Sequence, residues 1–250
     1  MILRQLLHTE PVIAVSYLIG CSGKGVAAVI DPVEAPETYL DLAEGFGTPI
    51  RFVIDTHLHA DHLSTGRALA ARAAAAYVLH SSAAADPPFH GVDDGDTLAV
   101  GNVTLRVLHL PGHTPEHIGL VVTDQTRGDR PWFVITGHTL MVGDMGRTEL
   151  ASTADVGARD LFRSAQQLKS LPDDVIVLPG AFAGSVCGRG LSGTPVSTIG
   201  FERHVNRTFS IGDEKTFVEF MQRDTPPPPP LAQQIRTANM RGAASTVSVP

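Results

Sequence analysis

Residues 50–62 read IRFVIDTHLHADH, an apolar run that ends in three histidines and an aspartate within six residues. The β-branched and aromatic first half predicts a strand, and a helical pattern begins directly behind the histidines. Metal ligands must converge on one point, and a loop between a strand and a helix can supply several of them from a short stretch. The donors here are His57, His59, Asp61 and His62. The stretch therefore predicts a metal site.

The composition is that of a globular protein with one substantial core. The chain has 250 residues and a formal net charge of −7, without a block of like charges, so neither a nucleic acid nor a membrane is an expected partner. Its early apolar run, residues 12–19, is short and lacks the features of a signal peptide. The two cysteines, Cys21 and Cys187, suit a reducing compartment. We therefore expect a cytoplasmic protein.

The hydrophobic periodicity predicts an α/β chain in which strands dominate. Expected strands are 12–19, 26–30, 50–54, 77–79, 103–110, 118–122, 132–136 and 175–178. Expected helices are 36–46, 63–76, 155–170 and 198–209. Five consecutive prolines near the end predict two parts, a body of residues 1–224 and a proline-rich arm of residues 225–250. We expect the arm to be extended, in part as polyproline II, and either to pack on a neighbouring subunit or to hang free.

Two further strand ends carry histidines. The sequence PGHTPEH follows the strand at 103–110 and contains His113 and His117. The sequence TGHT ends the strand at 132–136 and contains His138. Three strands thus deliver histidines at their ends, which indicates that the ligands of one site come from loops far apart in the sequence.

These motifs resemble, in order, the metal-binding loops of the metallo-β-lactamase fold. The matching pieces are THLHADH at 56–62, PGH at 111–113, TGH at 136–138 with Gly146-Arg147 behind it, and PGA at 179–181. Within that fold the chain is most similar to persulfide dioxygenases and their rhodanese-linked relatives, with glyoxalase II hydrolases as cousins, and the segment GSVCGR at 184–189 adds to this likeness. The resemblance implies a four-layer αβ/βα sandwich with the metal at one edge of two packed sheets.

Two positions depart from the family pattern. Family members with two metals have an aspartate where this chain has His138 and a histidine where it has Ala181. The resemblance therefore implies one metal, held by the residues that match the iron ligands of the dioxygenases, His57, His113 and His138. His59 would be a further ligand or lie close to the metal. Three neutral histidines still leave open positions on octahedral Fe(II) for a sulfur ligand and dioxygen.

We expect the remaining residues of the motifs to support the metal ligands or the substrate. Asp61 would orient ligands or water, or act as a base in a hydrolase, while His62, His117 and Asp144 would support the ligands through hydrogen bonds. Arg147 either pairs with an acid in its loop or holds a substrate carboxylate. Cys187 either contacts the substrate sulfur as a thiolate or is a buried structural cysteine.

Three functions remain open on this basis. The leading hypothesis is a mononuclear non-haem Fe(II) dioxygenase that oxidises a low-molecular-weight persulfide, such as glutathione persulfide, or a related thiol with O2. The alternatives are a mononuclear zinc hydrolase of a thioester or lactone, and a metal-binding sulfur-relay protein with little catalysis. The expected partners are a small sulfur compound and O2, and a homodimer is possible.

Overall fold

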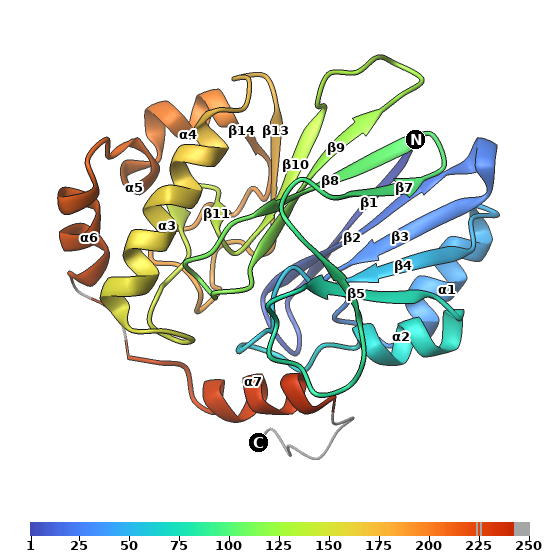
Figure 1. The fold of residues 1–250 in the computed structure, drawn as a ribbon, viewed down its shortest axis with the longest axis horizontal. Helices are drawn as coiled ribbons and strands as arrows, with labels where there is room; N and C mark the ends of the chain where they lie inside the picture. The colour runs from blue at the N-terminus through green and yellow to red at the C-terminus, as the bar shows by residue number, and fades with distance from the viewer. Residues whose placement is uncertain (224, 226, 243–250) are drawn as a thin grey trace.

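Two six-stranded sheets pack face to face and carry helices on their outer faces (Figure 1). The structure is a computed structural model that describes residues 1–223, 225 and 227–242. The first sheet has the order β1-β2-β3-β4-β5-β6. Its strands are β1 (Ile2–His8), β2 (Ala14–Cys21), β3 (Val26–Ile30), β4 (Ile50–Ile54), β5 (Ala76–His80) and β6 (His90–Val92).

The second sheet has the order β14-β13-β10-β9-β8-β7. Its strands are β7 (Thr97–Val100), β8 (Val103–His109), β9 (Ile118–Asp124), β10 (Phe133–Gly137), β13 (Ile176–Pro179) and β14 (Ser197–Thr198). A separate two-stranded hairpin is formed by β11 (Leu140–Met141) and β12 (Asp144–Met145). These sheets confirm the expected four-layer sandwich.

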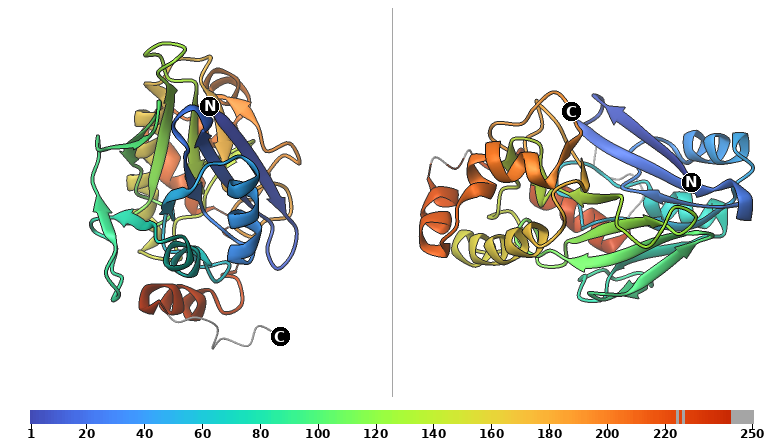
Figure 2. Two further views of the ribbon diagram at one scale, coloured as in Figure 1. Left: turned by 90° about the vertical axis from the view of Figure 1, so that its right-hand side faces the viewer. Right: turned by 90° about the horizontal axis from the view of Figure 1, so that it is seen from above.

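The helices divide between the two sheets, except for the last one. The first sheet carries α1 (Pro36–Gly45) and α2 (Gly66–Ala73), which follow a short 3-10 helix, η1 (Ser22–Lys24). The second sheet carries α3 (Ala154–Lys169), α4 (Ile199–Val205), α5 (Arg207–Ser210) and α6 (Glu214–Gln222). Helix α7 (Ala232–Arg241) lies across one end of the sandwich (Figures 1 and 2). Within the described part of the chain, no helix has the length and apolar character needed to cross a membrane.

Alternation along β2 shows how the core is divided. Val15, Tyr17 and Ile19 belong to the cluster between the two sheets, whereas Leu18 packs with the residues under α1 and α2. All four are buried because β2 is covered on both faces. Alternate side chains of one strand therefore serve two different cores.

The strand pairing brings the three histidine-bearing strand ends to one edge. β8 and β9 are antiparallel, with His109 opposite Ile118, so the loop between them closes at the end where β10, antiparallel to β9, also finishes. Across the sandwich, the backbone N–H of Ile118 donates to the carbonyl oxygen of Thr56 at 2.8 Å. This bond fixes the loop after β4 against the loops of the second sheet.

Two expectations about helices were wrong. The predicted helix 198–209 is interrupted at Asn206, whose side chain accepts a hydrogen bond from Phe209 N and so starts α5 as a separate helix. The arm is not simply extended, because α7 forms within it and packs on the body through Ala232, Ile235 and Ala238. The last residues of the arm, 243–250, lie outside the described residues.

The hydroxyl of Tyr17 links the two sheets, and we expect its removal to lower the free energy of unfolding. The hydroxyl of Tyr17 in β2 donates to the carbonyl oxygen of Pro179 in β13 at 2.6 Å, in a fully buried position. Tyr17→Phe leaves that carbonyl unpaired, and we expect the free energy of unfolding in urea to fall by about 1–3 kcal/mol. Ser170→Ala removes an exposed hydroxyl bond and should change it by less than about 0.5 kcal/mol. Equal stability of both variants would contradict this view of the sandwich.

Candidate metal centre

Three histidines from three strand ends meet at one edge of the sandwich. His57 follows β4, His113 lies in the loop between β8 and β9, and His138 follows β10. One ring nitrogen from each lies within 4.8 Å of the others, and the residues are only 1–2% exposed. The structure thus brings together the three residues that the sequence singled out.

The ring orientations suit a shared cation. The Nδ1 of His113 donates to the carbonyl oxygen of Arg147 at 2.8 Å, which leaves its Nε2 facing His138 Nδ1 at 3.4 Å. Two nitrogens bound to one ion at ordinary ligand distances are roughly 3 to 3.5 Å apart. The Nε2 of His57 is buried and has no hydrogen-bond partner among the described residues. The residues therefore fit a bound metal.

Electrostatics keep these rings neutral, as metal ligands must be. Burial lowers the pKa of His113 to about 3, with help from the neighbouring His138. Burial and the surrounding histidines hold the pKa of His57 well below its ordinary value, and burial also lowers the pKa of His138. The rings can therefore offer lone pairs without first losing protons at neutral pH.

His117 supports His138 from behind and is not available as a ligand. Its Nε2 accepts the backbone N–H of His138 at 3.0 Å, and its Nδ1 lies 3.1 Å from the hydroxyl of Thr139. Because Nε2 accepts, the proton sits on Nδ1. Gly137 makes the approach possible, since it has a φ of +49° and a Cβ there would lie 2.6 Å from Nε2 of His117.

Comparison with known proteins shows the family of this chain. Residues 9–180 match the family model of the metallo-beta-lactamase superfamily. The chain belongs to the metallo-β-lactamase superfamily.

Three relatives match different shares of the chain. The human mitochondrial persulfide dioxygenase ETHE1 (Homo sapiens) is 28% identical over 98% of this chain and 90% of its own length. A hydroxyacylglutathione hydrolase of Polaromonas sp. is 36% identical, over 66% of this chain and 60% of its own length. The crystal structure of ETHE1 from Myxococcus xanthus is 31% identical, with a TM-score of 0.81 over 96% of this chain and 98% of that one.

His59 lies next to the triad and is held by an acid that sequence reasoning missed. Its Nε2 is 3.2 Å from Asp31, which also accepts hydrogen bonds from the backbone N–H and the hydroxyl of Thr56. Although burial lowers the pKa of His59, the hydrogen bonds to Asp31 and Asp61 hold it well above the ordinary value. The position of Asp31, at the end of a strand parallel to β4, was the available signal.

Asp61 joins several neighbouring groups. It lies 2.9 Å from Nδ1 of His62 and 3.7 Å from Nδ1 of His59, and the thiol of Cys187 approaches it at 3.8 Å. Burial raises the pKa of Asp61, yet the adjacent His62 and His59 bring it well below the ordinary value. Burial and the Asp61 charge raise the pKa of Cys187 well above its usual range. Asp61 is thus a carboxylate and Cys187 a thiol.

The position of the second family metal lacks its last histidine. Ala181 is buried beside Met141 and Cys187, and its methyl group cannot replace the missing ring as a ligand. The Nε2 of His62 is nevertheless buried without a partner among the described residues. Other donors also lie beside the triad: those of His59, Asp61 and His62 are within 4.8 Å of one another, as are those of Asp61, His138 and Cys187.

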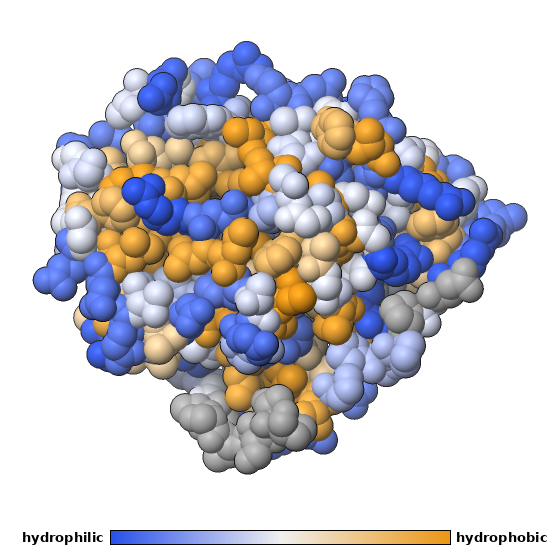
Figure 3. Space-filling model, turned by 180° about the vertical axis from the view of Figure 1, so that it is seen from behind, coloured by the Kyte–Doolittle hydropathy of each residue, from blue (hydrophilic) through white to orange (hydrophobic). Residues whose placement is uncertain are grey.

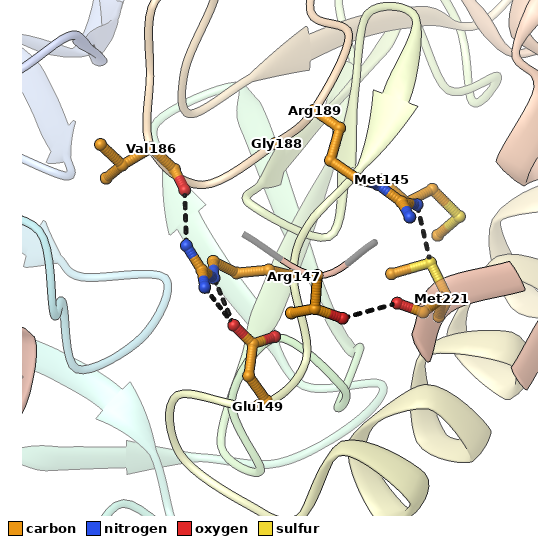
Figure 4. Close-up of a pocket in the computed structure, with 8 residues that line it drawn as sticks. Met145, Arg147, Glu149, Val186, Gly188, Arg189 and Met221 are labelled. Carbon is orange, nitrogen blue, oxygen red and sulfur yellow. Dashed lines mark hydrogen bonds and ion pairs between the residues drawn. The ribbon is translucent and has the colours of Figure 1, made fainter. Parts of the chain in front are cut away.

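Arg147 and Asp144 anchor loops around the site. The guanidinium of Arg147 pairs with Glu149 and donates to the carbonyl oxygen of Val186 at 3.2 Å (Figure 4), while its own carbonyl orients His113. Asp144 accepts from the hydroxyl of Thr208 at 2.6 Å and from the backbone N–H of Arg189 at 3.0 Å. Among the described residues, Glu149 is an acid that pairs with Arg147, whereas Asp144 binds Thr208 and Arg189.

The lowered pKa of His113 predicts a pH-dependent stability of the metal-free protein. The pKa of His113 is about 3 in the folded protein, against an ordinary value of 6.5. Between pH 3 and 6.5 the unfolded chain therefore binds one more proton than the folded one. The free energy of unfolding is accordingly full above pH 6.5 and falls as the pH drops below that value. Between pH 7 and 5.5, the free energy of unfolding of metal-free His113→Asn in urea should fall by about 1 kcal/mol less than that of the parent. The exposed His204→Asn should keep the parent's pH dependence. Identical pH dependence in all three proteins would contradict the neutral, buried state of His113.

Proposed function

We propose that this protein is a mononuclear non-haem iron dioxygenase that oxidises a low-molecular-weight persulfide, with glutathione persulfide as the first candidate. The observation that carries the proposal is the buried convergence of His57, His113 and His138, with their donor atoms within 4.8 Å of one another. These three residues would hold Fe(II), and His59 lies close by, with its ring centroid 4.2 Å from that of His57. Iron would supply activation of O2 beside the substrate sulfur.

The choice of a dioxygenase over a hydrolase rests on two supports. The likeness to the persulfide dioxygenase extends over 98% of this chain, whereas that to the hydroxyacylglutathione hydrolase covers 66%. In addition, His138 stands where two-metal relatives have the bridging aspartate, and Ala181 supplies no ring for a second metal. A hydrolase that depends on two metals would lack two of its donors.

The residues around the triad have distinct roles in the proposed reaction. One persulfide, one O2 and one water give one glutathione and one sulfite with release of two protons. Asp61, as a carboxylate beside His62, can accept a proton from the persulfide or from water. Arg147 orients His113 through its carbonyl oxygen, and the Cys187 thiol, which approaches Asp61, would lie beside the substrate sulfur. We keep the substrate-carboxylate role of Arg147 as a weaker alternative, since its guanidinium already binds Glu149.

The second candidate is a zinc hydrolase of a thioester. It is favoured by the 36% identity to the Polaromonas hydroxyacylglutathione hydrolase, and Asp61 would then serve as the base for metal-bound water. A sulfur-relay protein, the third candidate, would bind metal and show neither turnover. All three use the same histidines, so the metal and the substrate must be tested together.

The decisive assay loads the metal-free protein with Fe(II) or with Zn(II) under nitrogen. We expect the iron form to consume one O2 per sulfite formed from glutathione persulfide, and the zinc form to be inactive on it. Thioester hydrolysis by the zinc form without O2 uptake by the iron form would support the hydrolase. Absence of both turnovers would support the relay protein.

Variants of the triad provide a second test. Loss of a direct ligand by His57→Ala should cost more than the roughly 10- to 100-fold in metal affinity that an outer partner typically costs, whereas His204→Ala, at an exposed histidine, should leave affinity unchanged. Wild-type affinity in His57→Ala would contradict the assignment of the triad. His138→Asp restores the relatives' acid, and persulfide turnover in that variant alone would mean that the parent acts on a different substrate.

The proposed function also implies binding partners and a cellular location. The expected partners are the small sulfur compound and O2, without nucleic acid or membrane, in the cytoplasm. A homodimer is compatible with the apolar patches that lie between hydrophilic residues on the face shown in Figure 3. Exposed large apolar side chains include Leu7, Val196 and Phe201.

A further inference from the structure

Helix α7 lies directly against the loop that carries the first ligands of the metal centre. In Figure 1 it runs below the ends of the two sheets, and Figure 2 shows it in the same place from the side. We propose that α7 is a working part of the metal centre, in which Arg236 and Asn239 are positioning residues that hold the His57–His62 loop in its ligand-binding shape. The proposal rests on the proposed metal site, and it does not depend on which reaction that site performs.

Arg236 fixes the peptide unit between the first two motif histidines. It donates to the carbonyl oxygen of Leu58 at 2.7 Å and binds both carboxylate oxygens of Glu116 at 3.0 Å each. Glu116 in turn accepts the backbone N–H of Leu58 at 3.0 Å. Both polar backbone groups of Leu58 are therefore held, which fixes the backbone between His57 and His59.

The same ion pair connects two ligand loops. Glu116 lies in the loop of His113 and is only 3% exposed, and the Arg236 side chain is 14% exposed. A bidentate pair with so little access to water is stronger and more directional than an exposed one. Movement of α7 would therefore disturb the loop of His57 and the loop of His113 together.

Asn239 holds the backbone of the loop from His59 to Ser64. Its side-chain amide donates to the carbonyl oxygens of His59 and His62, at 2.9 Å each, and its carbonyl oxygen accepts the backbone N–H of Ser64 at 3.0 Å. One side chain thus satisfies three backbone groups of a loop that has no regular secondary structure of its own. Arg236 and Asn239 are three residues apart and so lie about one turn apart on the same face of α7. Together they bind the loop from Leu58 to Ser64.

Apolar contacts hold α7 in place independently of these two residues. Ile235 and Ala238 are buried, Met240 packs against Leu58 and Leu79, and the carbonyl oxygen of Met240 accepts the backbone N–H of Asp86 at 2.9 Å. Substitutions at Arg236 and Asn239 can therefore remove the polar bonds while the helix stays docked. This separation makes the proposal testable in the full chain.

The test measures metal binding with Co²⁺, whose absorption spectrum reports its ligand geometry. Metal-free Arg236→Ala and Asn239→Ala are titrated with Co²⁺ beside the parent, and we expect about tenfold weaker binding for each with an altered spectrum. Arg241→Ala and Gln234→Ala alter exposed residues of the same helix and should match the parent. Arg236→Lys keeps the charge and should recover part of the affinity, since it can make one but not two bonds to Glu116.

Hydrogen exchange of the metal-free proteins gives a readout without metal or substrate. We expect faster exchange at residues 57–64 in Arg236→Ala and Asn239→Ala, with the exchange of β2 and β9 unchanged. Because Arg236→Ala leaves Glu116 buried without its partner, the double variant Arg236→Leu/Glu116→Gln is included to remove the stranded charge.

The outcomes separate positioning from simple packing. Lower thermal stability with parental Co²⁺ affinity, spectrum and loop exchange would overturn the proposal and leave α7 as packing alone. If the double variant regained parental affinity, the effect of Arg236→Ala would come from the stranded charge, which would also overturn it. Failure of the persulfide assay would leave all these measurements valid, because none of them uses turnover.

Discussion

The structure depends on placing three neutral imidazole rings against one another in a buried edge of the sandwich. An unpaired buried ring nitrogen costs on the order of 1–3 kcal/mol, and His57 carries one that has no partner among the described residues. Protonation of the rings does not relieve this cost at neutral pH, because the pKa of His113 is lowered. A bound cation relieves this cost, since it accepts lone pairs from all three rings. Burial of the three ligands away from water therefore favours binding of a metal.

The surrounding contacts keep that arrangement from relaxing. His117 fixes His138 from behind, the Arg147 carbonyl oxygen fixes His113, and Asp31 binds Thr56 beside His57. Each of these bonds connects segments that are distant in the sequence, so the ligand geometry depends on the whole sandwich. This is the physical reason why a superfamily with one architecture can change its metal and reaction by substituting a few ligands.

Much of the fold and of the site could be predicted from the sequence, because both depend on local patterns. The strand at residues 50–54 and the helix near 155–170 are visible from hydrophobic periodicity, and the three ligands follow strands directly. Asp31 had only its position at a strand end as a signal, and no local pattern indicates a role for Arg236. Their roles depend on pairings with Thr56 and Glu116, and Arg236 is 120 positions from its partner.

Helix α7 was missed for a related reason. Five prolines precede it and dominate the local composition, while its apolar residues, Ala232, Ile235 and Ala238, are few and mostly small. Its formation depends on burial against the body of the protein more than on its own propensity. The interruption at Asn206 was likewise hidden, since capping by a side chain competes with helix continuation only in the folded context.

A single metal held by three histidines requires one metal equivalent per chain, and a metal titration measures this number. Metal-free protein is titrated with Co²⁺ or Fe(II) under nitrogen, and bound metal is measured after removal of the excess. We expect one equivalent, abolished by His57→Ala and retained in His62→Ala. Two equivalents, with one of them lost in His62→Ala, would contradict a single-metal site, because the unpaired ring nitrogen of His62 would then bind a second metal.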